Sequence, residues 1–335
     1  MTIPPCARPR IDPAVSARHR KKIAWPLEPL AKAADNYPMQ QKSVTTDVLD
    51  IAYLEYGAPD GWPCIMGHGF PYDVNAYAEA APILAQAGAR VLVPWLRGYG
   101  PTRFRSPQTL RSGEQAALGA DLLAFMDSLG IARTVLSGYD WGGRAACVVA
   151  VLHPERVIGL VSGNSYNIQN IARAMEPASP PEEAALWYQY LFHNERGRRA
   201  LERNRRGFTR QLWSMWSPKW GFDDTTFETS AVSFDNPDFV DVVIHSYRHR
   251  YALVDGDPAY AAIEAKLAAQ PPIRVPTIAI DGDSDGVNPG TAHHARKFEG
   301  FFERRVFAGA GHNLPQERPA EWARAVLDVR TAAEQ

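Results

Sequence analysis

The sequence predicts an α/β protein, in which a mostly parallel sheet carries helices on both faces and a helical cap is inserted late in the sheet. Short apolar runs that resemble buried strands, such as residues 90–94, alternate with helix-like segments in the first half of the chain. From about residue 166 to 270 this alternation stops, and only helical patterns rich in aromatic residues and arginine remain. The alternation returns at residues 276–280, which indicates that one sheet is interrupted by a separate helical block.

The expected elements divide the chain into four parts. Residues 1–42, rich in proline and basic residues, are expected to form a leader that covers the core, supports a homodimer or is partly disordered. The core then spans residues 43–165 and 271–335, and the cap spans residues 166–270. Strands are predicted at 43–47, 48–56, 64–67, 90–94, 134–136, 157–161, 276–280 and 304–307, and core helices at 76–87, 112–129, 142–152 and 319–329.

Composition excludes several classes of function. The 335 residues carry a formal net charge of -1, which argues against binding nucleic acid or a membrane surface through bulk charge. Three widely spaced cysteines form no Cys-x-x-Cys pair, so neither a zinc site nor a disulfide framework is expected, and free thiols favour a cytoplasmic location. No apolar run is long enough to span a membrane, and the N-terminus lacks the apolar segment of a secretory signal.

The most informative motif is Gly-x-Asp-x-Gly, centred on Asp140. An apolar strand precedes it and a helix of small residues follows it, and the two glycines allow a sharp turn that exposes the middle side chain. This is the nucleophile-elbow pattern with aspartate in place of the usual serine. A carboxylate is ionised at neutral pH and can attack an sp³ carbon directly. Asp140 is therefore the predicted nucleophile, and a turn that merely caps a helix is the simpler alternative.

Two later segments supply partners for this nucleophile. Three aspartates, Asp281, Asp283 and Asp285, follow the strand at 276–280, and His312 follows the last strand. The order nucleophile, acid, histidine is that of α/β-hydrolases. Asp281 is expected to end the strand and Asp283 to form a turn, so Asp285 is predicted to orient the histidine.

A loop after an earlier strand completes the predicted site. The sequence His68-Gly69-Phe70-Pro71 lies where hydrolases of this fold place one backbone donor for an oxyanion, and the residue after the nucleophile supplies the other. The backbone N–H groups of Phe70 and Trp141 are therefore the predicted donors. His68 is expected to hold this loop by hydrogen bonds.

These motifs together resemble the epoxide hydrolases of the α/β-hydrolase superfamily, in order and from about residue 43 onward. The resemblance rests on residues 68–71, 96–100, 138–142 and 311–313 together with Glu317. It implies that two cap tyrosines bind the epoxide oxygen, and it assigns these roles to Tyr188 and Tyr247. Tyr190 lies two residues further on and competes with Tyr188 for the first role.

The predicted activity is hydrolysis of an epoxide to a vicinal diol through an ester on Asp140, without metal or organic cofactor. The aromatic cap indicates a small, apolar organic substrate. A haloalkane or haloacid dehalogenase is the nearest alternative. Haloalkane dehalogenases commonly carry asparagine at the position of Phe70, and phenylalanine cannot donate a side-chain hydrogen bond. Fluoroacetate-type enzymes typically carry arginine at the first and fourth positions after the nucleophile, and here only Arg144 matches. A non-catalytic ligand-binding protein of the same fold is the second alternative. An esterase using Ser137 is disfavoured, because that residue precedes the elbow.

Overall fold

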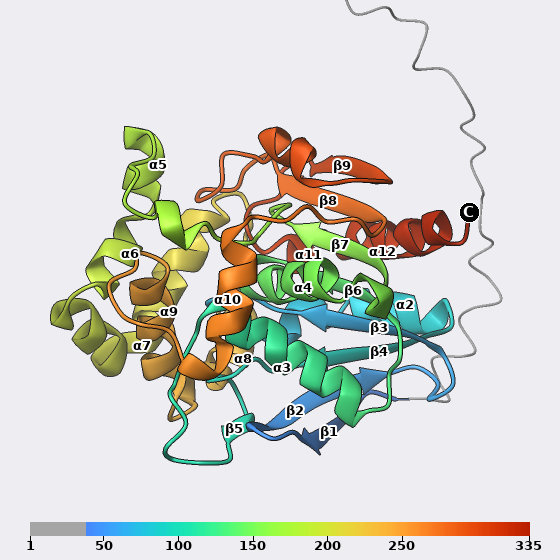
Figure 1. The fold of residues 1–335 in the computed structure, drawn as a ribbon, viewed down its shortest axis with the longest axis horizontal. Coiled ribbons are helices and arrows are strands. Elements are labelled where there is room, and N and C mark those ends of the chain that lie inside the picture. The colour runs from blue at the N-terminus through green and yellow to red at the C-terminus, as the bar shows by residue number, and fades with distance from the viewer. Residues whose placement is uncertain (1–37) are drawn as a thin grey trace, which may run out of the picture.

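The computed structural model describes residues 38–335, which build one twisted sheet with helices on both faces (Figure 1). The sheet order is β1-β2-β4-β3-β6-β7-β8-β9, with β5 paired to β2. The two pairings of β2 with β1 and β4 are antiparallel, and every pairing from β4 to β9 is parallel. The strands are β1 (Gln40–Thr45), β2 (Leu49–Tyr56), β3 (Trp62–Gly67), β4 (Ala89–Pro94), β5 (Arg103–Phe104), β6 (Thr134–Gly138), β7 (Val157–Gly163), β8 (Thr277–Gly282) and β9 (Phe302–Phe307).

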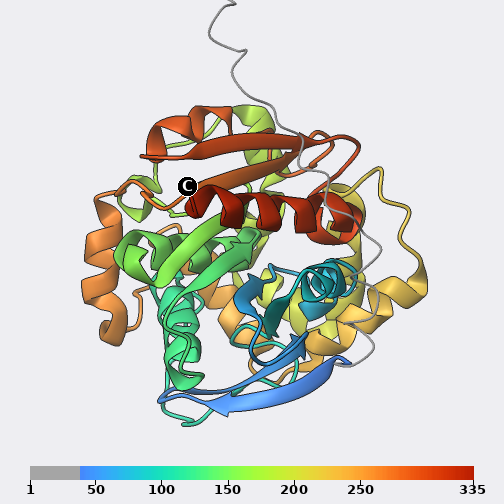
Figure 2. The same cartoon turned by 90° about the vertical axis from the view of Figure 1, so that its right-hand side faces the viewer.

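Helices cover both faces of the sheet, as a parallel sheet requires. On one face α4 (Asp140–Leu152) packs on β6 and β7, and α3 (Gln115–Ser128) packs beside it. On the other face α2 (Ala80–Gln86) and α12 (Pro319–Ala333) pack together, and Figure 2 shows α12, in dark red, on the side of the sheet that faces the viewer. Every residue of β6 and of β8 is buried, which explains why these strands appear as continuous apolar runs in the sequence.

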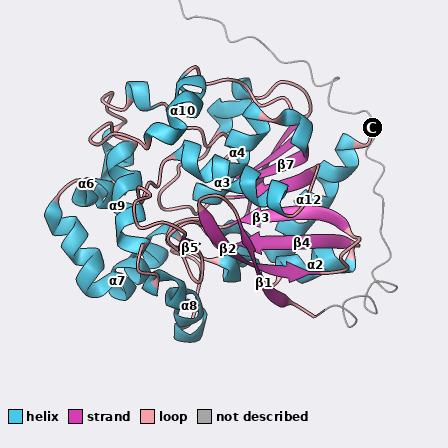
Figure 3. Cartoon of the chain, turned by 60° about the horizontal axis from the view of Figure 1, so that its bottom comes forward, coloured by secondary structure: helices cyan, strands magenta, loops and turns pink. Residues whose placement is uncertain are grey.

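The cap consists of helices and lies beside the strands (Figure 3). Local signals start its helices: the side chain of Asn194, for example, accepts hydrogen bonds from the first free N–H groups of α7. Its inner surface is aromatic, and Phe192, Trp213 and Trp216 are buried there. The helices are α5 (Pro180–Ala185), α6 (Trp187–Phe192), α7 (Glu195–Trp216), α8 (Asp224–Ala231) and α9 (Phe239–His249).

Some predicted boundaries differ from the observed ones. The helix expected at 76–87 is two elements, a short 3-10 turn at Val74–Tyr77, capped by Asp73, and then α2. The helix expected from residue 112 begins at Gln115, because the Ser112 hydroxyl and the Glu114 carboxylate bond to each other before the helix starts. Helix α10 (Ala261–Ala268), within the range assigned to the cap, packs on α3 of the core.

The predicted leader falls mostly on residues 1–37, which lie outside the described part, and its last residues already belong to β1. Cys64 and Cys147 are buried free thiols. Among the helices of residues 38–335, none combines the length and apolar character needed to cross a bilayer.

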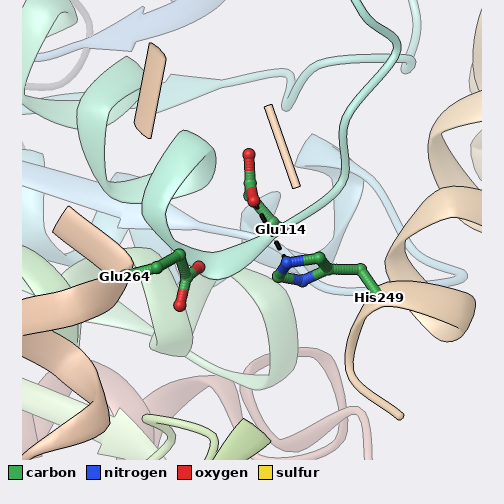
Figure 4. Close-up of side chains that lie close together, drawn as sticks. All are labelled: Glu114, His249 and Glu264. Atoms are coloured by element: carbon green, nitrogen blue, oxygen red, sulfur yellow. Dashed lines mark ion pairs between the residues drawn. The ribbon is translucent and has the colours of Figure 1, made fainter. Parts of the chain in front are cut away.

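A cluster of titratable groups joins α9, α10 and the start of α3 (Figure 4). Nε2 of His249 lies 3.3 Å from Oε2 of Glu114. The carboxylate of Glu264 accepts the backbone N–H of Ala116 at 3.1 Å and the amide of Gln115 at 2.9 Å, so it binds the first turn of α3. The existing bonds indicate a structural junction between the last cap helix and the core.

Candidate active site

Asp140 stands at a strained turn between β6 and α4. Its φ is +49°, a left-handed conformation that residues other than glycine rarely adopt. Two neighbouring glycines make room for the turn. A Cβ on Gly142 would lie 2.1 Å from the backbone of Gly67, and a Cβ on Gly69 would lie 2.5 Å from Cβ of Asp140. The backbone of three segments therefore meets closely around this one carboxylate.

The carboxylate of Asp140 has a different neighbour at each oxygen. Oδ1 accepts the backbone N–H of Phe70 at 2.7 Å, and Oδ2 lies 3.7 Å from Nε2 of His312. Burial would raise the pKa of Asp140, but the His312 ring, the charge of Arg144 and the Phe70 N–H hold it below its usual value. Asp140 is thus a partly buried carboxylate that stays ionised, with one oxygen held and the other directed toward an imidazole.

Asp285 is the aspartate that meets the histidine. Nδ1 of His312 lies 2.8 Å from its Oδ2. Asp281 instead binds Arg304 and Thr291, and Asp283 is exposed and accepts the N–H of Gly309.

The Asp285 carboxylate is itself held in place. Its Oδ1 accepts the backbone N–H groups of Val287 and Asn288 at 2.9 and 3.0 Å, and Oδ2 also accepts the side-chain amide of Asn164 at 3.2 Å. Burial alone would lower the pKa of His312, but the charges of Asp285 and Asp140 raise it to about 10. The charges of these two carboxylates therefore favour the protonated imidazole.

The loop that carries His312 is anchored to the cap. The backbone N–H of His312 lies 3.2 Å from the carbonyl of Trp216 and 3.1 Å from Oγ of Ser217, both at the end of α7. The Ser217 hydroxyl donates to Glu317, which also accepts the N–H groups of Gly311 and Asn313. No sequence motif indicates Trp216 or Ser217 in this role, because they lie about a hundred residues before the histidine.

Two cap tyrosines lie over this site. Tyr188 on α6 and Tyr247 on α9 are buried, their ring centroids lie 5.3 Å apart, and both rings contact Phe70. Burial raises the pKa of Tyr188 to about 12 and that of Tyr247 well above its usual value, so both hydroxyls keep their protons at neutral pH. Tyr190 points away, because its ring is 36% exposed and its hydroxyl bonds to Glu183.

The structure also places the other three predicted residues, His68, Phe70 and Trp141. The Trp141 ring stacks on Phe70 with centroids 5.8 Å apart, and its indole N–H is buried without a partner among residues 38–335. His68 is buried in the loop below. Its Nδ1 lies 3.1 Å from the carbonyl of Gly69, its Nε2 accepts the N–H of Leu96 at 3.1 Å, and burial lowers its pKa to about 4. His68 is therefore a neutral ring whose two nitrogens are both engaged.

The fold agrees with that of known proteins. A sequence profile of the family described as alpha/beta hydrolase fold matches residues 63–319. Epoxide hydrolase A of Mycobacterium tuberculosis is 27% identical, over 88% of this chain and 98% of its own length. A crystal structure of a candidate epoxide hydrolase from Klebsiella pneumoniae aligns with a TM-score of 0.86 and 42% identity, over 90% of this chain and 99% of that one.

A third relative extends the likeness in fold alone. Epoxide hydrolase A from Mycobacterium thermoresistibile aligns with a TM-score of 0.68 at 20% identity, over 87% of this chain and 98% of that one. The predicted fold class is therefore confirmed, with its mostly parallel sheet and helices on both faces. The family profile covers the elbow, Asp285 and His312, and on this evidence the chain belongs to the α/β-hydrolase fold family.

Proposed function

We propose that this protein hydrolyses epoxides to vicinal diols through a covalent ester on Asp140. The observation that carries the proposal is the pair of oxygens on that carboxylate, one bonded to the Phe70 N–H and the other facing His312 beneath two tyrosines. The names of the relatives in Mycobacterium tuberculosis and Klebsiella pneumoniae support the same substrate class.

In the first step, Oδ2 of Asp140 attacks an epoxide carbon and the carbon–oxygen bond of the ring breaks. The electron pair of that bond goes to the ring oxygen, which takes a proton from Tyr188 or Tyr247. Hydroxyls held in a buried site stabilise such a developing alkoxide more strongly than water does. Because the pKa values of both tyrosines are raised, each is a protonated donor before the reaction.

In the second step, water attacks the ester carbonyl carbon. Oδ1 of Asp140 becomes the carbonyl oxygen of the ester, and it already accepts the Phe70 N–H at 2.7 Å. The backbone N–H of Trp141 is the second donor that we assign to the resulting oxyanion.

His312 takes the proton from the attacking water, and Asp285 orients its ring. Ester formation removes the charge of Asp140, one of the two charges that raise the pKa of His312, so alkylation favours the neutral imidazole that the base requires. The imidazolium proton of the free protein restores the tyrosine. The oxyanion then collapses, and the bond between the carbonyl carbon and the alkyl oxygen breaks. The leaving alkoxide takes the proton of the new carboxyl group of Asp140, which returns Asp140 to a carboxylate. The sum of both steps is epoxide plus water giving diol.

The decisive experiment is a single turnover in ¹⁸O-labelled water with excess protein, followed by mass spectrometry of the peptide that contains Asp140. We expect one labelled oxygen in that carboxylate, because the water attacks the ester carbonyl. Steady-state diol formation by Asp140→Asn should fall by at least about 10³-fold. Unlabelled Asp140 together with full activity of Asp140→Asn would contradict the proposal.

A dehalogenase remains the second candidate, because one feature favours it. The indole N–H groups of Trp141 and Trp216 are buried without partners in residues 38–335, and such donors can bind a leaving halide. Halide release from a panel of haloalkanes and haloacids, with epoxides inert, would support this candidate. Binding of epoxides without any turnover would instead support a non-catalytic protein.

A further inference from the structure

Arg144 is a buried cation next to the nucleophile, and within residues 38–335 it forms no ion pair. It lies on α4, four residues after Asp140 and therefore on the same side of the helix. Its side chain is 7% exposed, and its Nε donates to the carbonyl of Asn167 at 3.2 Å. Its Nη1 is buried without any partner among residues 38–335, and no carboxylate in that range lies within 4.0 Å of the guanidinium.

A second arginine lies on the cap side of the same region. The guanidinium carbon of Arg250, just after α9, lies 4.2 Å from the ring centroid of Tyr247. Its Nε is buried and has no partner in the described part of the chain, and its Nη2 makes only a 3.4 Å contact with Ser246. Tyr247 thus contacts the Arg250 guanidinium, and its ring centroid lies 6.0 Å from that of Trp141.

Arg97, another buried arginine, has a different environment from Arg144 and Arg250. Arg97 is fully buried, and its guanidinium binds both oxygens of Asp121 at 2.6 and 2.7 Å and the carbonyl of Ser112 at 3.0 Å. A buried charge without such a partner is costly to the folded protein. Burial and the neighbouring charge of Arg250 lower the pKa of Arg144 to about 10, against the opposing effect of Asp140. Within residues 38–335, neither Arg144 nor Arg250 therefore has a directly bonded carboxylate like the one that compensates Arg97.

We propose that Arg144 and Arg250 form a carboxylate-binding subsite, and that the physiological substrate is an epoxide bearing a carboxylate group. The inference rests on the proposed function, since it specifies the substrate class of that same site. A guanidinium donates two parallel hydrogen bonds to a carboxylate, and a buried arginine with unused N–H groups can bind one without rearranging other bonds. The aromatic wall of Phe70, Tyr188 and Trp216 would contact the apolar part of the substrate.

The test uses pairs of substrates that differ only in charge. Epoxy acids with zero to three carbons between ring and carboxylate are each compared with the primary amide of the same acid, by kcat/KM for diol formation. Calorimetric titration of the corresponding diol acids and diol amides measures binding without turnover. We expect at least one acid to exceed its amide by about 10- to 100-fold in both measurements, as for hydrogen bonds to a charged group.

Variants connect this preference to the two arginines. Arg144→Gln and Arg250→Gln should each reduce the acid-to-amide ratio by about tenfold or more in both measurements. The ratio is the readout, because the charge of Arg144 also acts on Asp140 and a change there affects acid and amide alike. Arg203→Gln is the matched control, because Arg203 is exposed on α7, away from the site. Circular dichroism verifies the fold of each variant. If Arg144→Gln does not fold, the single variants Arg250→Gln and Arg144→Lys test the same assignment.

The outcomes separate this inference from the proposed function. Diol formed equally well from acids and amides would overturn the carboxylate subsite and leave epoxide hydrolysis intact. Binding of a diol acid that is lost in Arg250→Gln, with no epoxide turned over, would support the subsite and overturn epoxide hydrolysis. An acid preference that survives in both glutamine variants would also overturn the assignment of Arg144 and Arg250.

Discussion

Replacing Asp285 by asparagine tests the base that we assign to His312. The change keeps the shape of the side chain, and the amide oxygen can still accept the two backbone N–H groups of Val287 and Asn288. The amide NH₂ then takes the place of Oδ2. There it faces Nδ1 of His312 and also the side-chain NH₂ of Asn164, which is a donor itself.

The expected loss of rate in Asp285→Asn follows from the tautomer of the His312 imidazole. An NH₂ group opposite Nδ1 of His312 makes that nitrogen the acceptor, so the proton moves to Nε2, the nitrogen that faces Asp140. A ring that carries its proton there cannot take one from water. Loss of a general base lowers a rate by about 10²- to 10⁴-fold, which corresponds to about 2.7–5.4 kcal/mol in the barrier of ester hydrolysis.

Ester formation should be much less affected, because the nucleophile is unchanged. We therefore expect Asp285→Asn to show a burst of one epoxide per protein, and intact-protein mass spectrometry should show an adduct of the mass of the epoxide. Asp283→Asn is the matched control, because that exposed aspartate lies in the same turn without contacting His312. The reasoning is refuted if Asp285→Asn turns over within about threefold of the unmodified protein and no adduct accumulates.

Three further predictions concern the tyrosine pair, the elbow and pH. Tyr188→Phe should lower kcat for epoxide opening by about 10²-fold, measured by diol formation, because it removes one buried donor. Gly142→Ala should lower the free energy of unfolding by about 3 kcal/mol in urea titrations, since the new Cβ would overlap the backbone of Gly67, whereas Gly221→Ala, with open space around it, should change it by less than about 0.5 kcal/mol. The raised pKa of His312 stabilises the fold below its unfolded pKa of about 6.5, and this stabilisation is lost as pH rises toward 10. The stability gap to His312→Gln should therefore shrink between pH 6 and pH 10, and a constant gap would count against the raised pKa.

The sequence predicted those parts of the site that depend on short local patterns. Asp140, Asp285 and His312 each follow an apolar strand, and parallel strands end at one edge of the sheet, so their proximity followed from topology. The choice among three aspartates in one turn also agrees with the observed contacts. A turn this short leaves few directions in which each side chain can point.

The remaining parts depend on contacts between distant segments, which no local pattern encodes. The anchoring of His312 by Ser217 appears only once the cap is packed on the core. The bond from Asn164 to Asp285 appears only once β7 and β8 lie side by side, and the buried Nη1 of Arg144 that has no partner within residues 38–335 is likewise a result of packing. Helix ends were misplaced for a related reason. Side-chain hydrogen bonds of Asp73 and Ser112 compete locally with helix formation, and hydrophobic periodicity does not report them.

The anchoring of the histidine loop also bears on how this protein could change during evolution or engineering. The two groups that accept the backbone N–H of His312 lie at the end of the cap helix α7. The position of the imidazole therefore depends partly on the cap. Exchanging the cap for that of a relative would change the side chains around the substrate. It would also shift the His312 ring, unless Trp216 and Ser217 and their bonds to the His312 N–H were kept. Specificity and rate are therefore coupled here, and chimaeras should be joined after Ser217, not before it.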